Sequence, residues 1–187
     1  SNPAKSRLTS GPFPVLHQPL HEKMNKAKEI FETSTFNQYL GPQTPELLII
    51  TCGACTSYSI EAVEALKLEK RVGILKLGTT WPLPERLVAK HLNQTKRVLF
   101  VEEIDPFVER SVMELAASLL PATSHLTFYG KRSGYLTPYN EQSTDLVIGA
   151  LARILETNYQ PRDLTYDQKA KEVGNIVPPR PINLCPG

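Results

Sequence analysis

The chain has 187 residues, which suffices for one compact domain with a sizeable buried core. Its 21 Lys and Arg nearly balance 19 Asp and Glu, and this net charge of +2 gives no indication of a nucleic-acid partner. No apolar run reaches the roughly 20 residues of a membrane span, and no signal peptide is recognisable. Three cysteines are too few for a disulfide framework, so we expect free thiols and a cytoplasmic protein.

The N-terminal region divides into two parts by composition. Residues 1–19 contain four prolines and little apolar periodicity, which predicts an extended arm. Ser1-Asn2 replaces an initiator methionine and resembles the scar of a protease cleavage, so we expect an excised piece of a longer protein. From Leu20 to about Tyr39, apolar residues recur at three- and four-residue steps, which predicts an amphipathic helix. Gly41-Pro42 then ends this helix.

The centre of the chain alternates apolar strand-length runs with amphipathic helical segments. The predicted strands are 47–51, 72–77, 97–101 and 126–129, and the predicted helices cover 60–66, 84–91, 106–119 and 144–155. This alternation predicts an α/β fold, a three-layer αβα sandwich around a mostly parallel sheet. We place the domain at residues 20–157. Prolines without periodicity make 158–187 a predicted linker.

Cys52-Gly53-Ala54-Cys55 is the sharpest local motif, because it follows a buried strand and opens a helix. A helix N-terminus lowers the pKa of a thiol, so Cys52 and Cys55 are candidates for a redox pair or thiol switch. No Trp precedes Cys52, and the following elements are not those of a thioredoxin. Packing in a tight turn is the favoured interpretation.

The same turn offers backbone N–H groups that suit an anion, so nucleotide or anion binding is a second alternative. Only Gly53 is present there, and neither G-x-G-x-x-G nor G-x-x-x-x-G-K occurs in the chain. We therefore predict no dinucleotide site.

Two further loops follow predicted strands. In the first, Gly78, Thr79, Trp81 and Pro82 lead to Pro84, which is expected at the first position of the next helix, with Trp81 covering the sheet edge. Because parallel strands end at a common edge, we expect this loop to share a surface with Cys52 and Gly53.

The second loop, Glu102-Glu103-Ile104-Asp105-Pro106, offers three carboxylates. Asp105 before Pro106 predicts a helix N-cap, and Glu102 and Glu103 should point to opposite sides of the strand end. Histidines 17, 21, 91 and 125 are scattered, without catalytic-triad or zinc spacing. We therefore predict no catalytic residue and no metal site.

Three stretches of this sequence resemble a known family, the thiamine-dependent 2-oxoacid:ferredoxin oxidoreductases, and among them the α subunit of indolepyruvate ferredoxin oxidoreductase. The stretches are Leu48–Gly53, Val72–Glu85 with its LKLGTTWPLPE run, and Val98–Glu109 with VEEIDPF. The tail ending in Cys185-Pro186-Gly187 is similar to the family's linker before C-P-G-C-P.

The resemblance implies a middle domain like the C-terminal domain of transketolase, set between pyrimidine-binding and diphosphate-binding domains. It implies a structural, non-catalytic role at an interface, with Cys52, Gly53, Gly78, Thr79, Trp81, Pro82, Glu102, Glu103 and Asp105 as contact candidates. Thiamine diphosphate, magnesium and 4Fe-4S clusters would belong to the parent enzyme and not to this piece. The implied partners are the flanking domains, a second subunit, ferredoxin and CoA, and the diphosphate-binding domain would follow residue 187.

Overall fold

The computed structural model describes residues 13–139, 141–159 and 164–176. The contacts within the chain divide it into two units, one ending at Glu156 and the other beginning at Thr157. The second unit contains one described helix, α6 (Leu164–Gly174), within the segment predicted as a linker. Cys185, in the tail that resembles the family's linker before C-P-G-C-P, lies outside the described residues.

A five-stranded sheet forms the centre of the first unit. Its strands are β1 (Gln38–Leu40), β2 (Leu47–Thr51), β3 (Val72–Lys76), β4 (Arg97–Val101) and β5 (Thr127–Tyr129), in the spatial order β1-β3-β2-β4-β5. β2 to β5 are mutually parallel, and β1 pairs antiparallel with β3. The four parallel strands confirm the predicted sheet.

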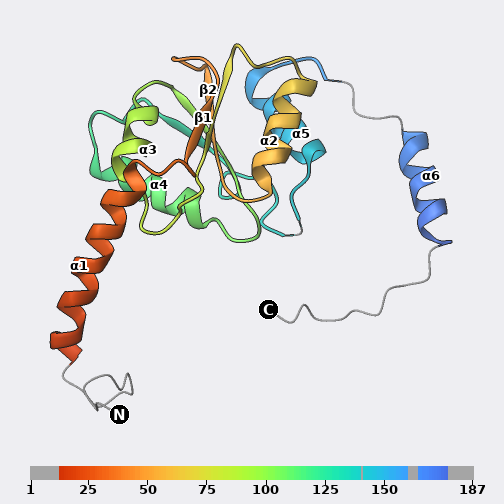
Figure 1. The fold of residues 1–187 in the computed structure, drawn as a ribbon. Coiled ribbons are helices and arrows are strands. Elements are labelled where there is room, and N and C mark those ends of the chain that lie inside the picture. The colour runs from red at the N-terminus through yellow and green to blue at the C-terminus, as the bar shows by residue number, and fades with distance from the viewer. Residues whose placement is uncertain (1–12, 140, 160–163, 177–187) are drawn as a thin grey trace. The chain divides into compact units, whose positions relative to one another are not determined.

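Helices cover both faces of the sheet. Figure 1 shows α2 (Cys55–Ala65) and α5 (Thr144–Leu155) on one side, and α3 (Glu85–Leu92) and α4 (Phe107–Ser118) on the other. Helices that connect successive parallel strands produce this arrangement. The α/β three-layer sandwich is confirmed.

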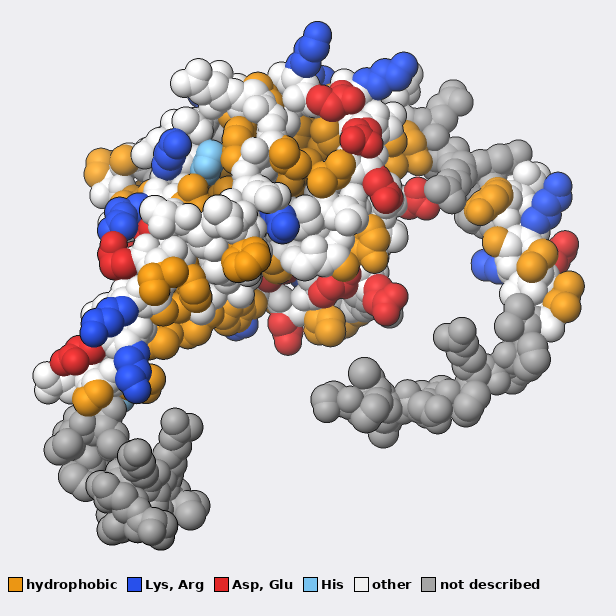
Figure 2. Space-filling model, viewed as in Figure 1, with side chains coloured by type: hydrophobic (Ala, Val, Ile, Leu, Met, Phe, Trp, Pro, Cys, Tyr) orange, Lys and Arg blue, Asp and Glu red, His pale blue; other side chains and the backbone are white. Residues whose placement is uncertain are grey.

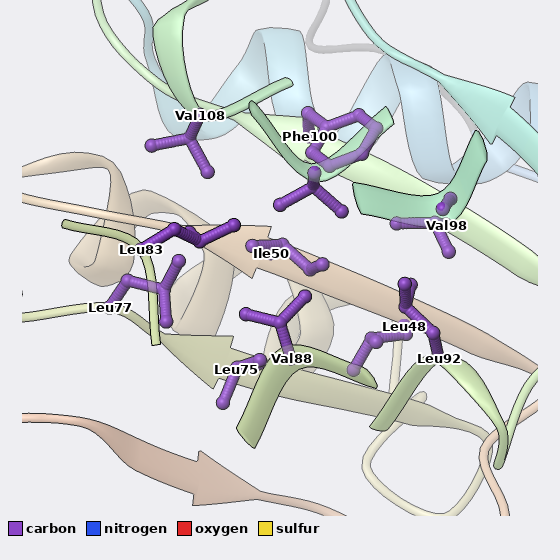
Figure 3. Close-up of a cluster of buried hydrophobic side chains, with 12 residues drawn as sticks. Leu48, Ile50, Leu75, Leu77, Leu83, Val88, Leu92, Val98, Phe100 and Val108 are labelled. Carbon is purple, nitrogen blue, oxygen red and sulfur yellow. The ribbon is translucent and has the colours of Figure 1, made fainter. Parts of the chain in front are cut away.

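The main core cluster lies between the sheet and the α3/α4 layer (Figure 3). Side chains alternate between the faces of a strand, so Leu48 and Ile50 of β2 enter this cluster while Ile49 and Thr51 face α2 and α5. All five residues of β2 are buried, which explains its uninterrupted apolar pattern.

Helix α1 (Phe13–Glu32) differs from the prediction at both ends. The structure begins the helix within the predicted extended arm and places Pro19 inside it. A proline fixes φ at a helix-compatible value, so it weakens a helix without forbidding it. The predicted C-terminal end was also wrong. Tyr39 lies in β1 because it pairs with β3 and stacks on His91, with ring centroids 4.4 Å apart.

Candidate functional site

The carboxyl edge of the parallel strands brings together the loops that carry the candidate residues. Cys52 and Gly53 follow β2, Gly78 to Pro82 follow β3, and Glu102 to Asp105 follow β4. A fourth loop, with Gly130 and Lys131, follows β5 and was not singled out from the sequence. Parallel strands end on the same side, and open α/β sheets place their functional surfaces there.

Glu102 holds the start of α4. Its buried carboxylate accepts hydrogen bonds from the backbone N–H groups of Val108, at 2.7 Å, and Glu109, at 2.8 Å. Burial raises the pKa of Glu102 above its usual value, while these two donors act to lower it. The predicted N-cap was wrong, because α4 has Pro106 at that position without a side-chain bond and Asp105 is exposed. A strand-end carboxylate supplies the acceptors instead.

Glu103 turns to the opposite side of the strand end, as predicted. One carboxylate oxygen accepts a hydrogen bond from the backbone N–H of Gln142 at 3.0 Å. The other accepts from the thiol of Cys55, with 3.5 Å between oxygen and sulfur. Glu103 therefore connects the loop after β4 to the α2/α5 layer.

The environment of the two cysteines opposes thiolate formation. Cys55 is fully buried, and burial followed by the charge of Glu103 raises its pKa to about 12. Cys52 is half-buried, and burial also raises its pKa, with Glu102 adding to the effect and Lys131 opposing it. At this turn, burial and the neighbouring carboxylates outweigh the start of α2 in setting the thiol pKa, which supports packing, the favoured interpretation, over the redox alternative.

The loop after β3 is attached to the segment between α1 and β1 through Asn37. Its side-chain oxygen accepts hydrogen bonds from the backbone N–H groups of Gly78, at 2.9 Å, and Thr79, at 3.0 Å. Its side-chain nitrogen donates to the hydroxyl of Thr79 at 2.8 Å. A Cβ on Gly78 would lie 2.5 Å from the carbonyl oxygen of Phe36, so only glycine fits this approach. Asn37 was missed because it is 41 residues from Gly78.

Trp81, which was expected to cover the sheet edge, stands on the surface. Its side chain is 64% exposed and packs edge-to-face against Phe107, with ring centroids 6.0 Å apart. Leu83 is the residue of this loop that enters the core. Trp81, Ile104 and Phe107 form an exposed apolar set at this edge, which we call the edge patch.

The start of α3 also takes its acceptors from a distant carboxylate. The helix begins at Glu85, one residue later than predicted, so Pro84 is its N-cap. Glu32, at the end of α1, accepts hydrogen bonds from the backbone N–H groups of Arg86, at 2.9 Å, and Leu87, at 2.8 Å. At the start of both α3 and α4, a carboxylate from another element therefore accepts the free backbone N–H groups.

Glu109 and Lys131 complete the edge, and the sequence analysis did not identify either. The buried carboxylate of Glu109 accepts hydrogen bonds from the backbone N–H groups of Lys131, at 3.0 Å, and Arg132, at 3.2 Å. The Lys131 ammonium donates to the carbonyl of Ile104. These bonds join the loop after β5 to the loop after β4.

A groove of about 480 Å³ runs beside the edge patch, between α1 and α4. Its lining includes His21 and Met24 of α1, Trp81 and Pro82 of the loop, and Leu115 of α4. Figure 2 shows hydrophobic surface where α1 joins the rest of the unit. Among the described residues, no three His, Cys, Asp or Glu side chains gather as metal ligands. None of the described helices is long and apolar enough to cross a membrane.

Comparison with known proteins finds the family described as "Transketolase, C-terminal domain" at residues 40–129. The chain is 36% identical over 179 residues to indolepyruvate oxidoreductase subunit IorA of Pyrococcus horikoshii, and this alignment covers 93% of the chain and 26% of the relative. It is 33% identical over 174 residues to the subunit of the same name from Methanothermobacter thermautotrophicus, covering 92% of the chain and 26% of that relative.

Among solved structures, a chain described as "Split gene transketolase, inactive beta4 tetramer" superposes with a TM-score of 0.49 at 16% identity. That superposition covers 64% of this chain and 41% of the other.

The match and the fold define the class. Residues 40–129 match the model of the transketolase C-terminal domain family, and they contain the whole parallel sheet with the helices α2, α3 and α4. Nearly the entire chain is related to indolepyruvate oxidoreductase subunit IorA and corresponds to about a quarter of that subunit. The resemblance seen in the sequence motifs is thereby confirmed.

Proposed function

We propose that this chain is a non-catalytic assembly domain of a cytoplasmic indolepyruvate oxidoreductase subunit. Its edge patch and the surrounding loops contact a neighbouring domain of the same subunit. The parent enzyme oxidatively decarboxylates aryl 2-oxo acids to acyl-CoA and passes electrons to ferredoxin. Thiamine diphosphate with magnesium supplies the decarboxylation chemistry, and 4Fe-4S clusters carry the electrons. The relatives are about four times as long as this chain, which leaves room for the domains that bind these cofactors.

The observation that carries the proposal is the edge patch. Trp81, Ile104 and Phe107 are 64%, 66% and 42% exposed at the carboxyl edge of the sheet. The apolar side chains of β2, β3 and β4 are buried. Aromatic side chains are enriched at the centres of protein interfaces, where they lose their contact with water. Ile104 also has a φ of 51°, a conformation that β-branched residues rarely adopt. This strain supports a functional reason for its position.

The loops that present the edge patch are firmly held. Asn37 binds the loop before Trp81, Glu102 binds the helix that begins with Phe107, and Lys131 binds the carbonyl of Ile104. A surface that is already ordered loses little conformational entropy when a partner binds. This preorganisation favours a contact surface over a mobile lid.

The polar side chains at this edge are engaged in holding the fold, which supports a role without chemistry. Glu102 and Glu109 each accept two backbone hydrogen bonds. The raised pKa values of Cys52 and Cys55 disfavour the thiolates that redox exchange requires. Nothing in the arrangement of the described residues favours the thiol switch or anion site over the assembly role.

The test uses the full-length subunit with Trp81→Glu and Phe107→Glu. We expect either variant to lower indolepyruvate oxidation at least about tenfold, because a charge at the centre of an interface is desolvated without a partner. Ile30→Glu is the matched control, since Ile30 is equally apolar, is 67% exposed and lies on α1 outside the edge patch. Full activity and normal assembly in both edge variants would contradict the proposal. Turnover of indolepyruvate with thiamine diphosphate by this chain alone would also contradict it.

A further inference from the structure

The beginning of α1 places two histidines one turn apart. The sequence analysis placed His17 in an extended arm and found no zinc spacing among the scattered histidines. Because the helix begins at Phe13, the two residues stand at positions i and i+4 on one face. Both side chains are exposed, and their Nε2 atoms lie 3.2 Å apart.

This separation matches the geometry of a metal-ligand pair. With metal–nitrogen bonds of 2.0–2.1 Å, two imidazole nitrogens on one ion are about 3.3 Å apart in tetrahedral and about 2.9 Å apart in right-angled coordination. The observed 3.2 Å lies between these values. The rings stand edge to face at 85° with centroids 4.4 Å apart, and because both side chains are exposed, each can turn to direct its Nε2 to a common ion.

We propose that His17 and His21 bind one divalent transition-metal ion, such as Zn²⁺ or Ni²⁺. The ion takes the place of the hydrogen between the two Nε2 atoms, and the imidazole that carried this hydrogen holds its proton on Nδ1 instead. Water completes its coordination, because no third His, Cys, Asp or Glu of the described residues joins this pair. Borderline-soft ions prefer imidazole, whereas Mg²⁺ prefers oxygen ligands, so the site discriminates against Mg²⁺.

The site would reinforce a weak turn of α1. Pro19 lies between the two histidines and has no N–H, so the helix lacks one backbone hydrogen bond there. The polar contacts that attach α1 to α3 come from Lys28, Glu29 and Glu32, at the opposite end of the helix. A metal that joins positions i and i+4 bridges the turn that Pro19 weakens.

Calorimetric titration of the whole chain with Ni²⁺ and with Zn²⁺ tests the site, and Mg²⁺ serves as the control ion. We expect one ion per chain and a loss of affinity of about tenfold or more in His17→Ala and in His21→Ala, because one ligand is removed. Both residues are exposed, so the variants should keep the far-UV circular dichroism of the metal-free protein. The variants retain all three cysteines, which keeps binding by thiols constant across the series.

A double variant, His21→Ala with Glu22→His, is the matched control for spacing. It keeps the number of histidines but turns the second imidazole about 100° around the helix, out of reach of the first. We expect it to bind as weakly as His21→Ala, with metal-induced NMR shifts of both imidazole rings only in the unmodified chain. Unchanged affinity in either single variant, binding by the double variant as tight as by the unmodified chain, or no binding at all would overturn the proposal.

Discussion

The two ends of the parallel sheet are held together in different ways. At the carboxyl edge, the buried carboxylates of Glu102 and Glu109 accept backbone hydrogen bonds from neighbouring elements. At the amino edge, Glu46 pairs with Arg71 and Arg97 through side chains that are about 40% exposed. Buried acceptors that satisfy backbone donors stabilise a fold far more than solvent-exposed ion pairs do. The edge that carries the edge patch is therefore the more firmly built one.

The largest effect should come from Glu102→Ala. Two backbone N–H groups at the start of α4 would lose their acceptor, and we expect a loss of about 2–4 kcal/mol in the free energy of unfolding. Glu102→Gln should lose about half as much, because its amide keeps one acceptor oxygen. Urea denaturation measures both. A change below about 0.5 kcal/mol in Glu102→Ala would show that the carboxylate does not hold the helix.

An intermediate effect should appear on acidification, through His91 in the last turn of α3. Burial lowers the pKa of His91 from its usual 6.5, so the unfolded chain binds a proton before the folded one does. Stability is complete above about pH 6.5 and falls as the pH decreases from there towards the folded-state pKa. This loss of stability should be absent in His91→Gln, which has no ionisable side chain at position 91. Urea denaturation of both proteins at pH 7 and pH 5.5 gives the change in the free energy of unfolding between the two pH values. An equal change in the unmodified chain and in His91→Gln would contradict this assignment.

The smallest effect should come from Glu46→Ala at the amino edge. The Nε of Arg71 donates to the Glu46 carboxylate at 2.8 Å, but both side chains remain in contact with water. We expect a loss below about 1 kcal/mol that shrinks further in 0.5 M salt, because exposed pairs are screened. A loss as large as that of Glu102→Ala would remove the contrast between the two edges.

The sequence predicted the buried parts of this fold well. Continuous apolar runs identify a strand that is covered on both faces, so β2, β3 and β4 were found together with the helices that connect them. β1 was missed because it has three residues with only Tyr39 half-buried, and it begins within the segment 20–39 that was predicted as a helix. The early prolines concealed the start of α1, since their effect on a helix depends on position.

The site was only partly predictable, for a different physical reason. The loops at the carboxyl edge follow from topology alone, so the candidate residues after β2, β3 and β4 were identified. Their bonding partners depend on tertiary packing. Glu32 lies 54 residues before the Arg86 amide that it binds, and nothing in local periodicity links the two. Glu102 lies six residues from Val108, but the sequence could not show that it would displace Asp105 from the capping role.

The end of α1 and the segment between α1 and β1 together hold the two ends of the loop that carries Trp81. Glu32 binds the amides of Arg86 and Leu87, and five residues later Asn37 binds those of Gly78 and Thr79. Both ends of the loop that carries Trp81 are thus fastened to the same short stretch of chain. A tilt of α1 would therefore be transmitted to both ends of this loop at once.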